Sequence, residues 1–211
     1  MNINVLVVKS ASVLAAALWI GSAVAAPLSE SAGNSVSAAE LQRQVVDFQT
    51  RFPTGTVVID TQQTYLYYVL GDGQAVRYGI GVGRDGFTWS GEQVVTRKAE
   101  WPDWTPPAGM IERQPYLPRW MAGGDGNPLG ARAIYLGSTI FRIHGTNAPA
   151  TIGRRVSSGC IRMLNADVID LYNRVGVGTR IVVMPGGSDV PKIGARVASA
   201  TRGVVISPAK Y

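Results

Sequence analysis

The chain contains a single cysteine, Cys160, within the segment RVSSGCIRM (155–163). A thiolate is a strong nucleophile, but a thiol reaches that form at neutral pH only when a neighbour lowers its pKa or accepts its proton. A lone cysteine is either an apolar filler of the core or a reactive thiol. One cysteine excludes an intramolecular disulfide. One cysteine and one histidine are also too few for the usual four-ligand structural zinc site.

The only histidine, His144, precedes Cys160 in the chain and ends the β-rich segment TIFRIH (139–144). Residues at strand ends often carry chemistry, because a rigid scaffold presents them to the solvent. The segment between the two residues is long enough to double back and bring Cys160 beside the imidazole ring. The alternative is a histidine that is only hydrogen-bonded within the fold. Together the two residues indicate thiol-based acyl transfer or hydrolysis, with His144 as the base.

Two neighbours of Cys160 suit acyl transfer. Gly159 has no Cβ, so the backbone N–H groups of Gly159 and Cys160 are candidate donors to the oxygen on which negative charge develops. Arg162 keeps its charge at neutral pH, and its planar guanidinium can donate two parallel hydrogen bonds to a carboxylate. The alternative role for Arg162 is a structural ion pair. The sequence therefore predicts a backbone oxyanion site and a carboxylate-binding side chain beside the thiol.

Short β-rich segments separated by turns must position these residues. We predict strands over 56–60, 64–70, 75–82, 91–101, 131–136, 139–144 and 179–184. One helix is predicted over 165–175, with Asn165 as its N-cap and Gly176 at its end. Residues 108–113 would add one helical turn after a proline-rich loop. Many short strands with one or two short helices predict a mainly β domain, either a sandwich or a partial barrel.

The N-terminal residues indicate export. Lys9 precedes an apolar stretch and then the segment AVA (23–25), so residues 1–25 are predicted to be a cleaved secretory signal peptide. The alternative is an uncleaved anchor, but the apolar run is shorter than the ~20 residues that span a bilayer. The remaining chain is interpreted as a leader that includes a short helix through Phe48 (26–53), a folded domain (54–186) and a basic tail (187–211).

The formal net charge is +6. This balance favours an anionic substrate, polymer or membrane surface, although a solvated basic face explains it equally well. The chain has no runs of lysine and arginine and no nucleic-acid motif, and export is predicted, so nucleic acid is excluded as a partner.

The segment HGT (144–146), followed by RVSSGCIRM (155–163) and Asn165, resembles the signature of the L,D-transpeptidases of the YkuD or ErfK/YbiS type. The resemblance covers residues 54–186 and implies a YkuD-like β-sandwich. Ser158 departs from the histidine that many members carry, which leaves His144 as the only imidazole base. Gly145 stands where some members carry a hydroxyl residue, so the third catalytic member would be the Gly145 backbone carbonyl, orienting His144.

The resemblance implies a peptidoglycan transpeptidase of cell wall biogenesis in the periplasm of a Gram-negative-type bacterium, with no metal or organic cofactor. Cys160 would attack the carbonyl at the L-centre of diaminopimelate in a tetrapeptide stem, and D-alanine would leave with a proton from His144. The acyl group would then pass to an amine of a second stem, of an outer-membrane protein or lipoprotein, or of a free D-amino acid. Carbapenems would acylate the same thiol.

The resemblance also implies a set of substrate-binding residues. Trp104 and Tyr116 flank a segment that resembles a flap over the site, with aromatic packing under a long loop as the alternative. The full set is Arg162, Ser157, Ser158, Thr146, Trp104 and Tyr116.

Two other functions stay open. A catalytically weak peptidoglycan-binding module would keep the fold without acylating its thiol. Sortases also place histidine, cysteine and arginine in this order. Their cysteine follows a threonine and their arginine lies on a later strand, whereas here Gly159 precedes Cys160 and Arg162 follows two residues later. A sortase-like enzyme therefore fits the spacing less well.

Overall fold

The computed structural model describes residues 39–185; the predicted signal peptide, the first part of the leader and the basic tail lie outside this range. Within it, no helix is long and apolar enough to cross a membrane. The predicted strand over 75–82 is divided into β4 (Gln74–Gly79) and β5 (Val82–Gly83), and that over 139–144 is reduced to β8 (Arg142–His144). The elements are β1 (Gln44–Asp47), β2 (Val57–Asp60), β3 (Tyr65–Gly71), β4 (Gln74–Gly79), β5 (Val82–Gly83), β6 (Gly91–Glu100), α1 (Ala108–Arg113), β7 (Arg132–Leu136), β8 (Arg142–His144), a 3-10 helix η1 (Pro149–Thr151), β9 (Arg155–Ser157), β10 (Ile161–Arg162), α2 (Asn165–Arg174) and β11 (Arg180–Val183).

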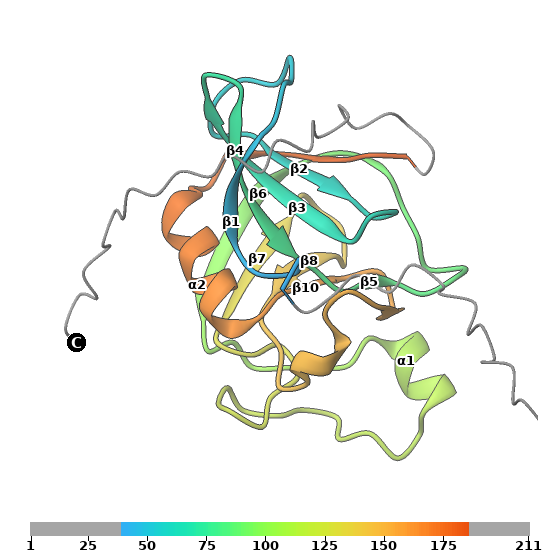
Figure 1. Cartoon of the computed structure of the whole chain (residues 1–211). Helices are drawn as coiled ribbons and strands as arrows, with labels where there is room; N and C mark the ends of the chain where they lie inside the picture. The colour runs from blue at the N-terminus through green and yellow to red at the C-terminus, as the bar shows by residue number, and fades with distance from the viewer. Residues whose placement is uncertain (1–38, 186–211) are drawn as a thin grey trace, which may run out of the picture. The chain divides into compact units, whose positions relative to one another are not determined.

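Nine of these strands form one mixed sheet in the order β1-β4-β3-β2-β11-β6-β7-β8-β10, and β5 pairs with β9 separately. The long strand β6 joins the two halves of the sheet (Figure 1). Its first residues pair with β11 and its later residues pair with β7, with a register shift between Val95 and Arg97. Such an irregularity bends a strand, which allows the two halves of the sheet to share one core.

The main core lies between these halves. Ile59 and Leu66 come from β2 and β3, Ile134 and Ile143 come from β7 and β8, and all four are fully buried in one cluster. Helix α2 adds Leu171 to the same cluster, because apolar residues at helical spacing line one of its faces. This packing confirms the predicted mainly β sandwich with the helix on it.

Residues before position 54 also take part in the sheet and in the core. The predicted leader helix is wrong, because residues 44–47 form β1, which pairs antiparallel with β4. The β-branched residues Val45 and Val46 suit a strand. Phe48 follows directly, is 1% exposed, and stacks on Tyr67 with ring centroids 4.5 Å apart. The segment therefore contributes to the core.

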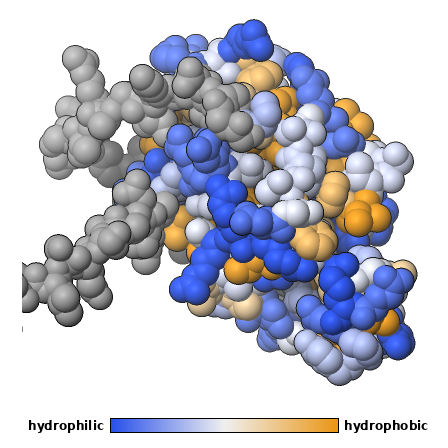
Figure 2. All heavy atoms as spheres, turned by 90° about the vertical axis from the view of Figure 1, so that its right-hand side faces the viewer, coloured by the Kyte–Doolittle hydropathy of each residue, from blue (hydrophilic) through white to orange (hydrophobic). Residues whose placement is uncertain are grey.

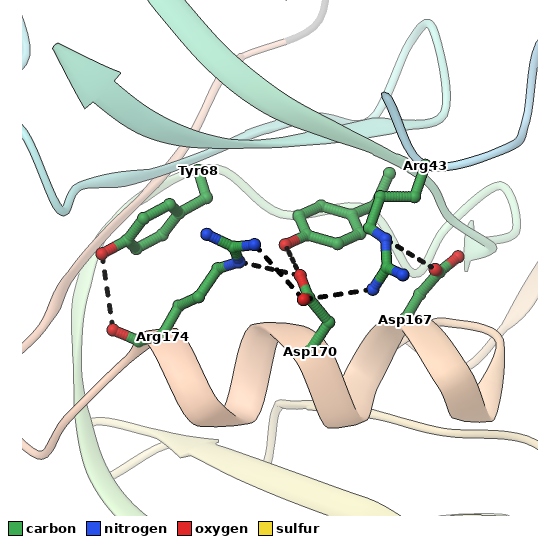
Figure 3. Close-up of polar contacts among 6 residues, drawn as sticks. Arg43, Tyr68, Asp167, Asp170 and Arg174 are labelled. Atoms are coloured by element: carbon green, nitrogen blue, oxygen red, sulfur yellow. Dashed lines mark hydrogen bonds and ion pairs between the residues drawn. The ribbon is translucent and has the colours of Figure 1, made fainter. Parts of the chain in front are cut away.

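Arg43 joins the same segment to α2 (Figure 3). Its Nη1 lies 3.2 Å from Asp170 Oδ1, and its Nε lies 4.0 Å from Asp167 Oδ1. Asp170 also accepts hydrogen bonds from Tyr78 Oη at 2.6 Å and from Arg174 Nε at 2.8 Å. Because part of this network is solvent-exposed, each ion pair contributes at most about 1 kcal/mol to stability. Phe48 is therefore the stronger anchor of the segment.

We expect Phe48→Ala to lower the free energy of unfolding by about 3 kcal/mol, because it leaves a cavity beside Tyr67. Val45→Ala is the matched control, since Val45 lies on the adjoining strand but is 58% exposed; it should change stability by less than about 0.5 kcal/mol. Urea unfolding of both variants measures the difference. Equal, small effects would show that the segment is not part of the cooperative fold.

Candidate active site

Two parallel strands bring the predicted catalytic residues together. β8 pairs with β10, with Arg162 opposite His144 and Ile161 opposite Ile143. Since side chains alternate along a strand, the two isoleucines enter the core while His144 and Arg162 share the other face. Cys160 directly precedes β10.

A pocket of about 240 Å³ opens on this face, and both Cys160 and His144 line it. Arg84, Arg142 and Arg162 also line it, whereas no carboxylate from the described part of the chain does. On the side of the domain that carries α1 and β5, hydrophilic side chains dominate the surface and apolar ones form separate small patches (Figure 2). The pocket is thus a cationic site with a thiol and an imidazole in its wall.

His144 is held as a neutral base. The residue is 4% exposed, and burial lowers its pKa to about 3; the carbonyl groups of Gly145 and Leu129 oppose this shift, while Arg162 and Arg142 add to it. Nδ1 lies 2.6 Å from the Gly145 carbonyl oxygen. A carbonyl only accepts, so Nδ1 carries the proton and Nε2 keeps a lone pair that can accept one. The contact expected between His144 and Gly145 is therefore present.

Cys160 is a neutral thiol in the resting site. Burial raises its pKa, and the opposing effects of the Arg142 side chain and backbone and of Arg162 are smaller. A thiol of this kind becomes a nucleophile only when a base takes its proton. The arrangement therefore favours transfer of the proton to His144 over a permanent ion pair.

The loop that carries Cys160 is held by Ser157. The Ser157 hydroxyl accepts a hydrogen bond from the Gly159 N–H at 3.1 Å and donates one to the Cys160 carbonyl at 2.6 Å. This contradicts the prediction that the Gly159 N–H is an oxyanion donor, because its hydrogen is already used. Within residues 39–185 the Cys160 N–H makes no such bond, so it is the remaining candidate.

Gly159 has a conformational role instead. Its φ is +107°, which residues with side chains rarely adopt, and a Cβ there would lie 2.4 Å from Phe141 Cε1.

Residues 54–183 match the YkuD family model, the L,D-transpeptidase catalytic domain. The chain belongs to the L,D-transpeptidase family. It is 39% identical over 135 residues to the probable L,D-transpeptidase ErfK/SrfK of Escherichia coli K12, a match that covers 61% of this chain and 43% of that protein. It is 38% identical over 136 residues to the probable L,D-transpeptidase YbiS of the same strain, covering 60% and 43%. The matched region thus spans less than half the length of both relatives.

Solved structures of the family share the fold. An L,D-transpeptidase from Mycobacterium smegmatis has a TM-score of 0.50 and 18% identity, over 62% of this chain and 58% of that one. L,D-transpeptidase 3 from Mycobacterium tuberculosis has a TM-score of 0.50 and 17% identity, over 63% and 62%. These neighbours confirm a YkuD-type β domain.

Of the substrate-binding residues expected for this L,D-transpeptidase-family chain, Arg162, Ser157, Ser158 and Trp104 line the pocket, whereas Thr146 and Tyr116 do not. Thr146 is 5% exposed, and its Oγ1 accepts a hydrogen bond from the Ala148 N–H at 3.0 Å. Its hydroxyl therefore stabilises the turn after β8. Tyr116 is 81% exposed, with its hydroxyl 3.3 Å from Gln114 Oε1. Neither side chain lines this pocket, and their roles in substrate binding stay predictions.

Asn165 is the first residue of α2 rather than its N-cap, which is Leu164, and no side chain caps the helix. The Asn165 Oδ1 instead accepts hydrogen bonds from the Ala131 N–H at 3.0 Å and the Thr146 N–H at 3.1 Å. In this L,D-transpeptidase fold the Asn165 side chain therefore joins the residue before β7 to the loop after His144. These bonds restrain the backbone next to His144.

Arg84 and Arg142 are pocket residues that sequence reasoning missed. Arg142 lies two residues before His144, so strand alternation was a usable signal for placing both on one face. Arg84 comes from the loop after β5 and reaches Ser158 Oγ at 3.4 Å, a contact with no local signal. The Nε atoms of Arg142 and Arg162 are buried without a hydrogen-bond partner in the described chain. Buried donors of this kind suit an anionic ligand.

Proposed function

We propose that this chain is a peptidoglycan L,D-transpeptidase that forms its acyl-enzyme on Cys160. The observation that carries the proposal is that His144 of β8 and Cys160, the residue before the adjoining β10, line one pocket, with His144 Nε2 left as a proton acceptor. Membership of the family supports the reaction class. The pocket supports it further, because a thiol, an imidazole and three arginine side chains line it together.

The first half-reaction acylates Cys160. His144 takes the thiol proton while sulfur bonds to the carbonyl carbon at the L-centre of diaminopimelate, and the carbonyl electron pair moves onto oxygen. The Cys160 N–H donates to that oxyanion. When the carbonyl re-forms, the C–N bond breaks, and the D-alanine nitrogen leaves with the proton held on His144.

The second half-reaction transfers the acyl group. The nitrogen of an incoming amine attacks the thioester, and His144 takes one of its protons. The C–S bond then breaks, and the sulfur recovers a proton from His144. The acceptor is a second stem peptide, an outer-membrane protein or lipoprotein, or a free D-amino acid. Residues 54–186 are proposed as the catalytic domain, on which β1 and Phe48 pack, and the signal-like N-terminus favours export to the periplasm.

The donor stem carries free carboxylates, and the arginines of the pocket offer them charge-assisted hydrogen bonds. We expect Arg162→Ala to lower kcat/KM for the tetrapeptide about 10- to 100-fold while the fold persists, since one such bond contributes roughly 1.5–3 kcal/mol. Arg162→Lys should recover only part of this loss, because a point charge lacks the planar fork. Arg142→Ala should act in the same direction. Steady-state kinetics with tetrapeptide muropeptides measure the effects.

The control for charge alone is Arg51→Ala, because Arg51 is exposed and lies outside the pocket lining. Its kinetics should match those of the wild type. If Arg162→Ala and Arg51→Ala behave alike, Arg162 is a structural residue only.

The function itself is tested by incubating the purified mature protein with tetrapeptide muropeptides and each class of acceptor, followed by mass spectrometry. Release of D-alanine with a 3→3 cross-linked, protein-linked or D-amino-acid-exchanged product supports the proposal and identifies the acceptor. Binding of muropeptides without D-alanine release, by a folded protein with a free thiol, would favour the peptidoglycan-binding module instead.

A further inference from the structure

We infer that Trp89 is a positioning residue that aims the Cys160 backbone N–H at the oxyanion; the inference rests on the acyl transfer proposed above. Trp89 lies in the loop between β5 and β6, distant from Cys160 in sequence. Its indole Nε1–H donates a hydrogen bond to the Gly159 carbonyl oxygen at 2.7 Å. This contact joins the loop to the peptide immediately before the nucleophile.

The Gly159 carbonyl and the Cys160 N–H are the two ends of one planar peptide unit. A hydrogen bond that holds the carbonyl oxygen therefore also sets the direction of the N–H, which points the opposite way within the same plane. Accepting a bond at oxygen also polarises the amide, which strengthens donation from its nitrogen. An oxyanion donor that is already aimed needs no reorganisation during the reaction.

This peptide needs such a restraint because it follows a glycine with φ of +107°, where the backbone has unusual freedom. Ser157 Oγ holds the Gly159 N–H on one side and the Cys160 carbonyl on the other. These two bonds hold the peptides before Gly159 and after Cys160. They do not hold the Gly159–Cys160 peptide between them. The Trp89 indole supplies the missing contact.

Trp89 is itself held in place. Its ring stacks on Phe141 with centroids 4.7 Å apart and an interplanar angle of 4°. Phe141 directly precedes Arg142 of β8 and also packs against Gly159, where an added Cβ would lie 2.4 Å from Cε1. The indole therefore connects the strand that carries His144 with the loop that carries Cys160.

The test separates the donor from the ring. Trp89→Phe keeps an aromatic ring on Phe141 but removes the N–H, and benzothienylalanine at position 89 replaces only the N–H with sulfur. We expect either change to lower the acylation rate with a carbapenem, and kcat for the tetrapeptide, about 10- to 100-fold with little change in KM. Alkylation of Cys160 by iodoacetamide forms no oxyanion, so its rate and pH profile should stay as in the wild type.

Trp120→Phe is the matched control, because Trp120 is 58% exposed and lies outside the pocket lining. Its acylation and alkylation rates should be those of the wild type. Unchanged acylation in both Trp89 variants would overturn the inference. An equal fall in acylation and alkylation would overturn it as well, since Trp89 would then only support the loop. If the wild type itself is not acylated, the proposed function fails together with the inference.

Discussion

Cys160→Ala is expected to abolish both D-alanine release and acyl-enzyme formation, because the chain has no other thiol. The fold should persist, since alanine fills part of the same space and Cys160 is only partly buried. Release of D-alanine from the tetrapeptide, measured against the wild type, should fall to background. Circular dichroism and thermal unfolding of the variant, with Cys160→Ser as a near-isosteric control, establish that the loss is chemical.

The same pair of proteins tests where an acylating inhibitor binds. After exposure to a carbapenem, intact-protein mass spectrometry should show one covalent adduct on the wild type and none on Cys160→Ala. An adduct on both proteins would place the reactive group elsewhere. An absence of adduct on a folded wild type with a free thiol would favour a binding module.

His144→Ala should lower the acylation rate by about 10²- to 10⁴-fold at neutral pH, because the Cys160 thiol would lose its proton acceptor. The pH dependence should change as well. Since the pKa of His144 is about 3, the wild-type base is neutral from about pH 5 to about pH 8, and the rate should vary little there. Burial raises the Cys160 pKa, so the variant should depend on the small thiolate fraction, and its rate should rise about tenfold for each pH unit.

His144→Asn is the matched control for packing, because its amide nitrogen can take the place of Nδ1 and keep the hydrogen bond to the Gly145 carbonyl. It should be as slow as His144→Ala and show the same rise with pH. If asparagine restores the wild-type rate, His144 acts by holding the loop and not as a base. Stopped-flow measurement of acylation across pH distinguishes the two outcomes.

Local sequence patterns were enough to predict the main elements and the catalytic pair. The β-rich segments between turns correspond to the strands of the sheet, and the helical spacing of Val168, Leu171 and Val175 predicted the buried face of α2. His144 and Cys160 were predicted as a pair because each is the only residue of its type in the sequence, and the structure places both in one pocket. The connection from β8 to β10 contains η1 and β9, and it is long enough to double back and pair the two strands in parallel.

The predicted helix through Phe48 failed because the strand that pairs with this segment lies far away in the chain. Residues 44–47 have a pattern that suits either helix or strand, and pairing with β4 decides in favour of the strand. Gly159 was predicted as a backbone oxyanion donor, and the family resemblance implied that Thr146 binds substrate. Their N–H groups donate to Ser157 and Asn165 respectively, and these are contacts that residue type does not encode.

Protonation at the site was also decided by tertiary structure. The sequence by itself determined which groups can exchange a proton, namely the Cys160 thiol and the His144 imidazole. Burial of both determined that each is neutral at rest, because a charge in a poorly hydrated wall is costly. Trp89 and Arg84 reach the site from the loop between β5 and β6, and only the folding of that loop against the Cys160 segment brings them there. Hydrogen bonds, burial and charge depend on the side chains that meet in space, which is why these features required the folded chain.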